Sequence, residues 1–271
     1  MISFSSNYYD SFSIFHGSIA GIMGTRFDLL ISKLSKSETV SLWNKVVIEL
    51  ERLHKMMNRF DSRSELSRIN FNAQKSPTIL SEEMWDILND CKQYNKLTEG
   101  FFDITLNDMS QVIFDETSKS VVFATKDLYF DLGGYAKGYA LEKIKKMLLD
   151  ANVEHSLINF GDSSISAIGN HPFGNCWSIS IENPFQKGEM LKEIELKNQD
   201  FSSSGNLPTH TQHIINPYTK ELNSQSKLVC VCAKNPIEAE VLTTTLMLAT
   251  SEQQKRIKSN FKIDKIFVFN L

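Results

Sequence analysis

The amino-acid sequence predicts an α+β fold. Segments in which apolar residues recur every three or four positions alternate along the chain with short runs of β-branched and aromatic residues, so helices and strands are both expected. A chain of 271 residues, 41% of them hydrophobic, is long enough to bury a full core. The core is expected either as one large α+β domain or as two intertwined lobes, and no second domain is required.

The N-terminal half is expected to begin with little regular structure and then to form a strand and two helices. Residues 1–13 are rich in Ser, Tyr and Phe without a clear period, whereas Thr25–Ser32 is typical of a strand that enters a core. Apolar residues at three- and four-residue steps predict a helix over 38–59. Ser81 can cap a second helix over 81–96.

Short strands and a third helix are expected next. Val121–Ala124 and Leu128–Asp131 have the spacing of a hairpin, which would lead the chain into Gly133 and Gly134. A helix is predicted directly after these glycines. Beyond this helix, paired strands are predicted at 156–160 and 165–169, followed by a strand at 177–184.

The C-terminal segment is predicted to form a strand, two helices and a last strand. Leu228–Ala233 is typical of a strand that places Cys230 and Cys232 on one face. Asn235 and Pro236 mark a helix start, because Asn can cap and Pro suits the first helical position. The capping pattern recurs at 251–254 before another helix, and 265–270 is predicted as the closing strand.

Charge and cysteine content narrow the function classes. The net charge of −3 and the pI near 6.1 argue against a surface built for nucleic-acid phosphates. The four cysteines lack the spacing of a zinc site or a disulfide scaffold, so buried free thiols are expected. No window reaches transmembrane length and no signal-peptide pattern is present. These features favour a cytoplasmic location for the chain as given, and a periplasmic or lipid-anchored one if a leader was removed.

The segment DLGGYAKGYA, Asp131–Ala140, holds the first candidate site. A strand ends, Gly133 and Gly134 allow a tight turn, and a helix starts at once, so free N–H groups are presented. These groups favour a phosphate, and Lys137 would add a full positive charge. The alternative is a tight turn between strand and helix that binds no ligand, and the two glycines taken alone favour that alternative.

A carboxylate and a hydroxyl form the second candidate site. Glu240 and Thr244 are four residues apart on a predicted helix, so both side chains share one face and can bind a hard cation such as Mg²⁺. A solvated helix face is the alternative. The three consecutive threonines at 243–245 are unusual inside a helix and call for an explanation.

Two further segments carry candidate residues. The polar stretch at 202–220 contains His210 and His213, either of which can act as a general base near neutral pH or lie on the surface of a hairpin. Phe101 and Phe102 stand beside Asp103 and can form an aromatic wall for a flat cofactor. Consecutive phenylalanines are more often core residues, so this second segment is weak evidence alone.

Taken together and in order, these segments resemble the ApbE family of FAD:protein FMN transferases from about Ile22 to Ala249. DLGGYAKGYA closely matches the family's D-L-G-G-I-A-K-G-Y-A. MNRFDSRSELSRIN resembles its M-S-x-Y-x-x-x-S-E-L-S-R-x-N block, and HIINP resembles its H-I-I-D-P. MGT, FFDIT and AEVLTT are similar to its opening motif, its F-D-P-T and its A-D-A-L-A-T.

The resemblance implies an ApbE-like (T-fold-like) two-lobed core of mixed sheets with flanking helices and FAD in the cleft between the lobes. It implies a single domain over 1–271, with 1–20 as an N-terminal extension and 21–271 as the flavin transferase core. Matched residue by residue, the family's flavin site corresponds to a set of six residues. They are Met23, Phe60, Phe101, Phe102, Asp103 and Lys137.

The resemblance also implies a metal, a phosphate-binding turn and a base. The metal ligands would be the Ala136 carbonyl, Glu240 and Thr244, and His213 is the candidate base. Gly133 and Gly134 would lie against the FAD pyrophosphate. The sequence departs from the family where Phe60 replaces Tyr, Glu240 replaces Asp, and Asn216 replaces the Asp of D-P. A further departure is Gly161–Ile165, which stands where the family often has Gly-Gly-Asp-Ile.

The implied activity is the magnesium-dependent transfer of FMN from FAD to a Thr or Ser hydroxyl of a target flavoprotein, with release of AMP. The implied partners are therefore FAD and an acceptor protein, and no nucleic acid is expected. Two alternatives follow from the altered metal ligand. One is a pyrophosphatase that converts FAD to FMN and AMP, and the other is a non-catalytic FAD-binding protein.

Overall fold

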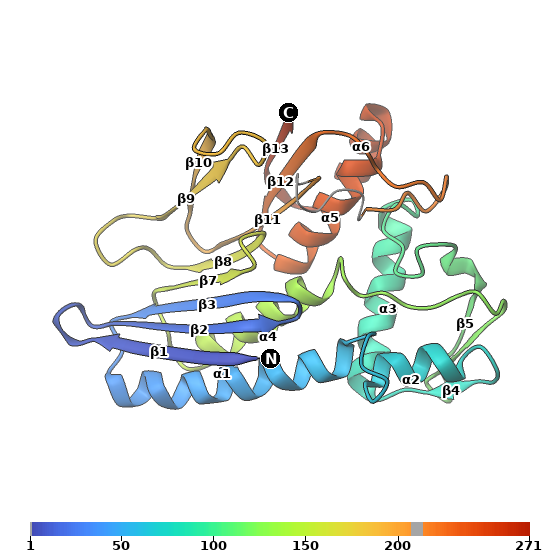
Figure 1. The fold of residues 1–271 in the computed structure, drawn as a ribbon, viewed down its shortest axis with the longest axis horizontal. Coiled ribbons are helices and arrows are strands. Elements are labelled where there is room, and N and C mark those ends of the chain that lie inside the picture. The colour runs from blue at the N-terminus through green and yellow to red at the C-terminus, as the bar shows by residue number, and fades with distance from the viewer. Residues whose placement is uncertain (1, 207–213) are drawn as a thin grey trace.

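The computed structural model describes residues 2–206 and 214–271 of the chain. Its framework is an eight-stranded sheet with the order β1-β2-β3-β7-β8-β11-β12-β13 (Figure 1). The strands are β1 (Ser3–Tyr9), β2 (Ile14–Ile22), β3 (Thr25–Ser32), β7 (Ser156–Phe160), β8 (Ser164–Ile168), β11 (Gln199–Gly205), β12 (Lys227–Ala233) and β13 (Ile263–Asn270). All the strand pairings in this sheet are antiparallel over the described residues, whereas mixed sheets were expected. Tight hairpins such as β2–β3 and β7–β8 reverse the chain between neighbouring strands, which makes those pairs antiparallel.

The first two strands belong to the main sheet, although residues 1–20 were expected to form an extension. The β2 side chains of Phe15 and Ile19 are buried in the main core. Strand β1 pairs with β2 along its length, but nearly all of its residues are exposed. An edge strand with polar residues on both faces shows no apolar alternation, which is why the sequence pattern did not reveal β1.

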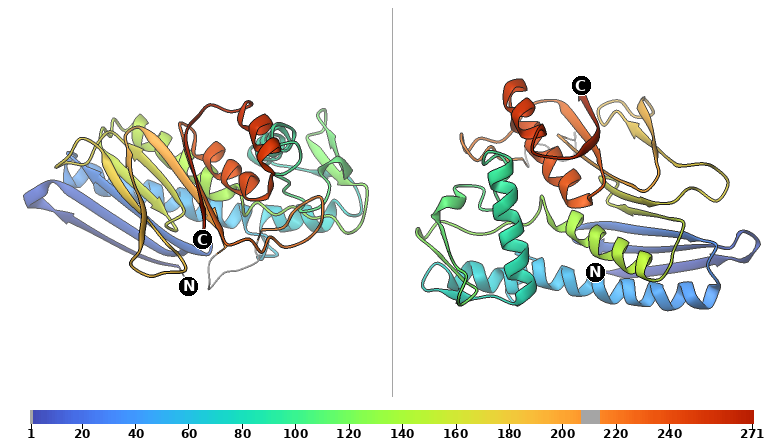
Figure 2. Two further views of the ribbon diagram at one scale, coloured as in Figure 1. Left: turned by 90° about the horizontal axis from the view of Figure 1, so that it is seen from above. Right: turned by 180° about the vertical axis from the view of Figure 1, so that it is seen from behind.

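Three helices cover one face of the main sheet, as the rear view in Figure 2 shows. They are α1 (Lys36–Met57), α4 (Ala136–Asp150) and α5 (Pro236–Leu248). Helix α1 lies against β2, α4 against β7 and β8, and α5 against β11 and β12. The opposite face of β8, β11 and β12 is covered by a hairpin of β9 (Trp177–Glu182) and β10 (Met190–Leu196), whose apolar side chains share one buried cluster with Cys230 and Cys232.

A smaller lobe stands beside the main sheet (Figure 1). It contains α2 (Glu65–Asn72), α3 (Glu82–Leu97) and a three-stranded sheet of β4 (Thr78–Ile79), β6 (Ser120–Phe123) and β5 (Val112–Asp115). Short 3-10 turns at Asp10–Phe12 and Met109–Gln111, and α6 (Ser251–Lys258) near the C-terminus, complete the described elements. The predicted two-lobed α+β arrangement is therefore confirmed.

Most predicted elements appear with similar bounds, but the hairpin of Val121–Ala124 with Leu128–Asp131 is wrong. Strand β6 pairs with β4 on one side and β5 on the other, so both of its edges are occupied. Residues 128–131 form no strand. The Asn70 side chain forms hydrogen bonds with this segment in place of a strand. Its amide donates to the Phe130 carbonyl (2.9 Å), and its oxygen accepts from the Phe130 N–H (2.7 Å).

The described part of the chain contains no helix that is both long and apolar enough to span a membrane.

Candidate functional site

A cavity of about 930 Å³ opens between the main sheet and the segment that follows α3. Its wall is built from the start of α4, one face of α5, the turn between β7 and β8, parts of β9, β11 and β12, and the segments 101–106 and 214–217. Eight of the predicted site residues line this cavity. They are Phe101, Phe102, Asp103, Gly133, Gly134, Lys137, Glu240 and Thr244.

The first turn of α4 meets the first turn of α5 because Gly138 has no side chain. A Cβ on Gly138 would lie 2.9 Å from the Cα of Ile237, so any larger residue would push the helices apart. The start of α5 is itself fixed, since the Asn235 side chain accepts from the N–H groups of Ile237 (2.8 Å) and Glu238 (3.1 Å). This close approach places Lys137 of α4 opposite Glu240 of α5.

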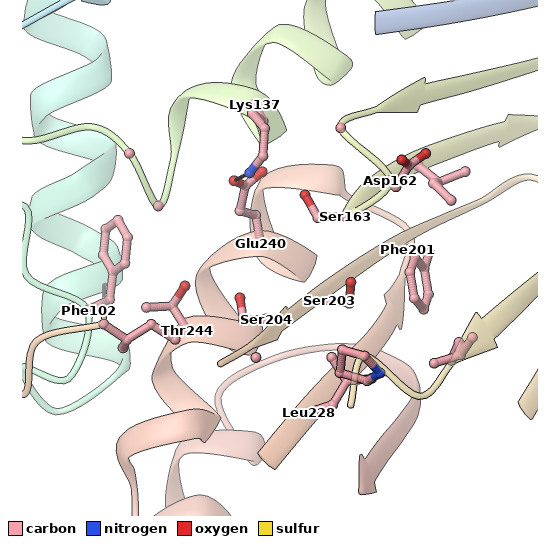
Figure 3. A pocket seen from close by; sticks show the side chains of 18 of the residues that line it. Phe102, Lys137, Asp162, Ser163, Phe201, Ser203, Ser204, Leu228, Glu240 and Thr244 are labelled. Carbon is pink, nitrogen blue, oxygen red and sulfur yellow. Dashed lines mark hydrogen bonds and ion pairs between the residues drawn. The ribbon is translucent and has the colours of Figure 1, made fainter. Parts of the chain in front are cut away.

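Lys137 and Glu240 form an ion pair at the wall of the cavity, as Figure 3 shows. The Glu240 side chain is only 4% exposed, whereas that of Lys137 is 22% exposed. The second Glu240 oxygen accepts from the Ser164 hydroxyl at 3.3 Å. A carboxylate this deeply buried needs such partners, because its charge has lost most of its hydration.

The three consecutive threonines of α5 have three different environments. The Thr243 hydroxyl donates to the Glu240 carbonyl (2.8 Å) and accepts from the Ser204 hydroxyl (2.9 Å), which ties α5 to β11. Thr244 faces the cavity near Phe102 and Ser204 (Figure 3). Thr245 is buried, and its hydroxyl has no hydrogen-bond partner among the described residues. The unusual run therefore combines a packing contact with a residue at the site.

The glycine turn, the hydroxyl and an aromatic ring converge on one point of the wall. A Cβ built on Gly134 would lie 3.6 Å from the Phe102 ring and 3.7 Å from the Thr244 hydroxyl oxygen. The absent side chain at Gly134 leaves this space open. The turn precedes α4, so its amides and the positive end of the helix dipole favour an anion here.

Asp103 organises its own loop. One carboxylate oxygen accepts from the Thr105 N–H (2.7 Å) and hydroxyl (2.6 Å), and the other accepts from the Met109 N–H (2.9 Å). Phe101 is held by the Tyr218 ring, whose centre is 5.1 Å away. These contacts fix the aromatic wall that the sequence predicted.

The remaining predicted residues lie outside the cavity lining or outside the described residues. Met23 has a left-handed backbone (φ 45°), and its N–H donates to His54 Nδ1 at 3.2 Å. Phe60 is 81% exposed. Ala136 is the first residue of α4, next to the lining residue Lys137. His210 and His213 lie outside the described residues.

The donor set suits a hard cation. Glu240 and Thr244 supply a carboxylate and a hydroxyl on one cavity wall, and a carboxylate has about four lone-pair positions, of which Lys137 and Ser164 use two. Among the described residues, no group of three or more His, Cys, Asp or Glu side chains could hold a metal. Mg²⁺ needs no such cage, because it commonly takes one or two carboxylates together with water and substrate phosphates. The residues present therefore fit magnesium.

Sequence reasoning missed one wall of the cavity. The missed residues include Asn159, Asp162 and Ser163 at the β7–β8 turn, Ser203 and Ser204 on β11, and Ile179–Glu182 on β9. The turn had a usable signal in the sequence, because Gly161 and Asp162 directly follow a predicted strand and such a pair indicates a turn. In the structure both residues adopt positive φ (67° and 57°). Strand β9 had none, because its position over the sheet depends on contacts distant in sequence.

The sequence was compared with family models and with proteins of known function. The sequence model of the ApbE family matches residues 23–120 and 107–267, which together include most of the chain. The chain belongs to the ApbE family. Among its relatives, the FAD:protein FMN transferase of Escherichia coli strain K12 is 22% identical, covering 87% of this chain and 78% of that protein. The Vibrio cholerae enzyme of the same name is 24% identical, covering 85% and 80%.

Solved structures of ApbE proteins share the fold. The flavin transferase ApbE from Vibrio cholerae superposes with a TM-score of 0.79 at 20% identity, covering 99% of this chain and 92% of that one. The apo form of the Pseudomonas stutzeri flavinyl transferase ApbE gives a TM-score of 0.75 at 20% identity, covering 96% and 88%. At this identity the likeness establishes the ApbE fold alone.

Proposed function

We propose that this ApbE protein is a magnesium-dependent FAD:protein FMN transferase that attaches FMN through a phosphoester to a Thr or Ser hydroxyl of a target flavoprotein. The observation that carries the proposal is the convergence of Gly134, Phe102 and Thr244 on one point of a large cavity, with Glu240 beside them. An anion-binding turn suits the FAD pyrophosphate, an aromatic wall suits the flavin ring, and hard oxygen donors suit Mg²⁺.

In this proposal the flavin lies against Phe101 and Phe102, and the pyrophosphate lies on the Gly133–Gly134 turn. Met23 and Phe60, which lie outside the described lining, stay candidates by sequence alone. The cavity volume of about 930 Å³ is of the size that a dinucleotide needs. Asp103 keeps the aromatic segment in place through its loop. Lys137 supplies the one positive charge of the described cavity lining.

The metal would be held by Glu240, Thr244 and the Ala136 carbonyl. When bound, it would offset the negative charge that develops on the phosphate oxygens during transfer. The protein's own groups would contribute in the same direction, since the amides at the α4 start and the Lys137 ammonium are fixed before the reaction begins.

The transfer step would need a base and an acceptor hydroxyl. His213, outside the described residues, is the sequence-based candidate for that base. It would take the proton from the hydroxyl as the oxygen bonds to the FMN phosphorus, while the bond from that phosphorus to the AMP oxygen breaks and AMP leaves. No covalent enzyme intermediate is required.

The test is to incubate the purified protein with FAD, with and without Mg²⁺, and with a peptide or domain that carries the family's acceptor sequence. We expect magnesium-dependent AMP release and flavin on the acceptor in equal amounts. AMP with free FMN would instead identify a pyrophosphatase, and FAD binding without AMP would leave two explanations, a binding protein or a wrong acceptor. If the protein neither binds FAD nor releases AMP, the flavin assignment is wrong.

A further inference from the structure

The cavity is more acidic than a pyrophosphate site should be. Its described lining includes five carboxylates and one lysine. The carboxylates are Asp103, Asp131, Asp162, Glu182 and Glu240. Lys137 is paired with Glu240, and the Asp103 carboxylate accepts from groups of its own loop. Asp131, two residues before the glycine turn, is the carboxylate whose charge most directly opposes a phosphate bound on that turn.

Asp131 is neutralised from outside the cavity by Arg59. The Arg59 Nε lies 2.8 Å from one Asp131 oxygen. The other Asp131 oxygen accepts from the Gly133 N–H at 2.8 Å, so one carboxylate joins the arginine to the turn. The Asp131 side chain is 19% exposed and the Arg59 side chain 35% exposed, which leaves the pair only partly screened by water.

The guanidinium group of Arg59 is fixed by two aromatic rings. Its central carbon lies 4.2 Å from the Phe60 ring centre and 5.6 Å from the Tyr129 ring centre. Both distances lie within the range of cation–π contacts. These contacts also give Phe60, which is exposed and outside the cavity lining, a connection to the site through Arg59.

Helix α2 aligns the two segments that carry Arg59 and Asp131. The Ser67 hydroxyl donates to the Arg59 carbonyl at 2.9 Å, and Asn70 forms both of its hydrogen bonds with Phe130, the residue before Asp131. Ser67 and Asn70 are three residues apart and share one face of the helix. The SELSRIN segment therefore acts as a brace between the two segments.

We propose that Arg59 is a positioning residue for the Gly133–Gly134 turn. It holds the Asp131 carboxylate on the Gly133 N–H and neutralises its charge, so that the turn can accept the phosphates of FAD. This inference rests on the proposed function, since it concerns the same phosphate site.

The test measures FAD affinity by calorimetry for the wild type, Arg59→Gln, Asp131→Asn and the double variant. Arg59→Gln leaves an unneutralised carboxylate beside the phosphates, and we expect the Kd for FAD to rise by about tenfold. Asp131→Asn removes the charge and keeps an oxygen for the Gly133 N–H, so its Kd should be equal to or below that of the wild type. The double variant should return to within about threefold of the wild type.

The matched control is Arg63→Gln. Arg63 lies four residues after Arg59, is exposed and pairs with Asp61, so the substitution removes the same charge away from the turn. It should bind FAD as the wild type does. The deficit of Arg59→Gln should shrink at high salt, and at saturating FAD its kcat for transfer should stay near that of the wild type, because the effect is on binding.

Two results would overturn the inference while leaving the proposed function intact. The first is equal FAD affinity of the wild type and Arg59→Gln. The second is a double variant that binds FAD as weakly as Arg59→Gln does, which would show that the arginine acts through packing alone. If Arg59→Gln does not fold, the FAD affinity of Asp131→Asn tests the proposal instead. A Kd of Asp131→Asn more than about threefold above that of the wild type would contradict it. A wild type that binds no FAD would instead overturn the proposed function, and the inference with it.

Discussion

Replacing Lys137 with Met tests how much the ion pair at the cavity wall contributes to the folded state. Methionine keeps much of the lysine stem but removes the ammonium group. Among the described residues, the Glu240 carboxylate, 4% exposed, would then keep only the Ser164 hydroxyl at 3.3 Å as a partner. A buried carboxylate without a countercharge is costly, so Lys137→Met should destabilise the protein.

The magnitude follows from the burial of the two partners. Breaking a buried ion pair by removing one partner costs about 3–5 kcal/mol. Because Lys137 is 22% exposed and borders the cavity, water screens part of the interaction and the lower end, about 3 kcal/mol, applies. For a protein of this size each kcal/mol lowers Tm by about 2–4 °C, so a decrease of roughly 6–12 °C is expected.

Thermal unfolding followed by circular dichroism measures this change. Lys143→Met is the matched control, since Lys143 lies on the same helix and makes a partly exposed pair with Glu83 at 3.4 Å, worth about 0–1 kcal/mol. The double variant Lys137→Met/Glu240→Gln should recover most of the lost stability, because it no longer buries a charge. A Tm for Lys137→Met within about 2 °C of the control, or no recovery in the double variant, would refute the reasoning.

Three further predictions concern the site and the helices that hold it. Thr244→Val should lower magnesium-dependent AMP release at least about tenfold, whereas Thr245→Val, which removes a buried hydroxyl without a described partner, should keep activity and Tm. Burial and the nearby Asp90 charge raise the pKa of Glu142, so its ionisation lowers the free energy of unfolding as pH rises above its ordinary pKa of 4.5. Glu142→Gln should therefore be more stable than the wild type at about pH 7 and equal to it below about pH 4, as urea unfolding would show; equal stability at both would contradict this. Gly138→Ala should cost about 1–3 kcal/mol in thermal unfolding, because the added Cβ would lie 2.9 Å from a backbone atom of α5, and an unchanged Tm would contradict the close approach.

The sequence predicted those parts of the site that depend on local patterns. Asn235 and Pro236 marked the start of α5, and the spacing of Glu240 and Thr244 placed both on one face of that helix. Gly133 and Gly134 marked the turn before α4. Each of these signals lies within a few residues of the feature that it predicts.

The parts that were missed depend on contacts between distant segments. Leu128–Asp131 has the composition of a strand, but α2 provides its backbone partners through Asn70, and no local pattern reveals that a side chain will replace a neighbouring strand. Phe60 matched a flavin-site position by motif, yet it lies outside the cavity lining and contacts Arg59. A motif identifies the residue type at a position, whereas the path of the chain decides which neighbour that residue meets.

The described cavity joins two kinds of structure. The end that we propose for the phosphates and the cation comes from the first turn of α4 and from Glu240 and Thr244 of α5, and the two helices are held together at Gly138 and by the pair of Lys137 with Glu240. Its other walls include the segments 101–106 and 214–217, which are loops. Chemistry that depends on charge placement needs fixed groups, because a displacement of about 1 Å can cost two orders of magnitude in rate. Recognition of different acceptor proteins needs surfaces that can vary, and loops tolerate variation better than packed helices do. The division explains why local motifs predicted the residues at the helices and the Phe101–Asp103 segment, while the β9 and β11 residues of the wall became visible only in the folded chain.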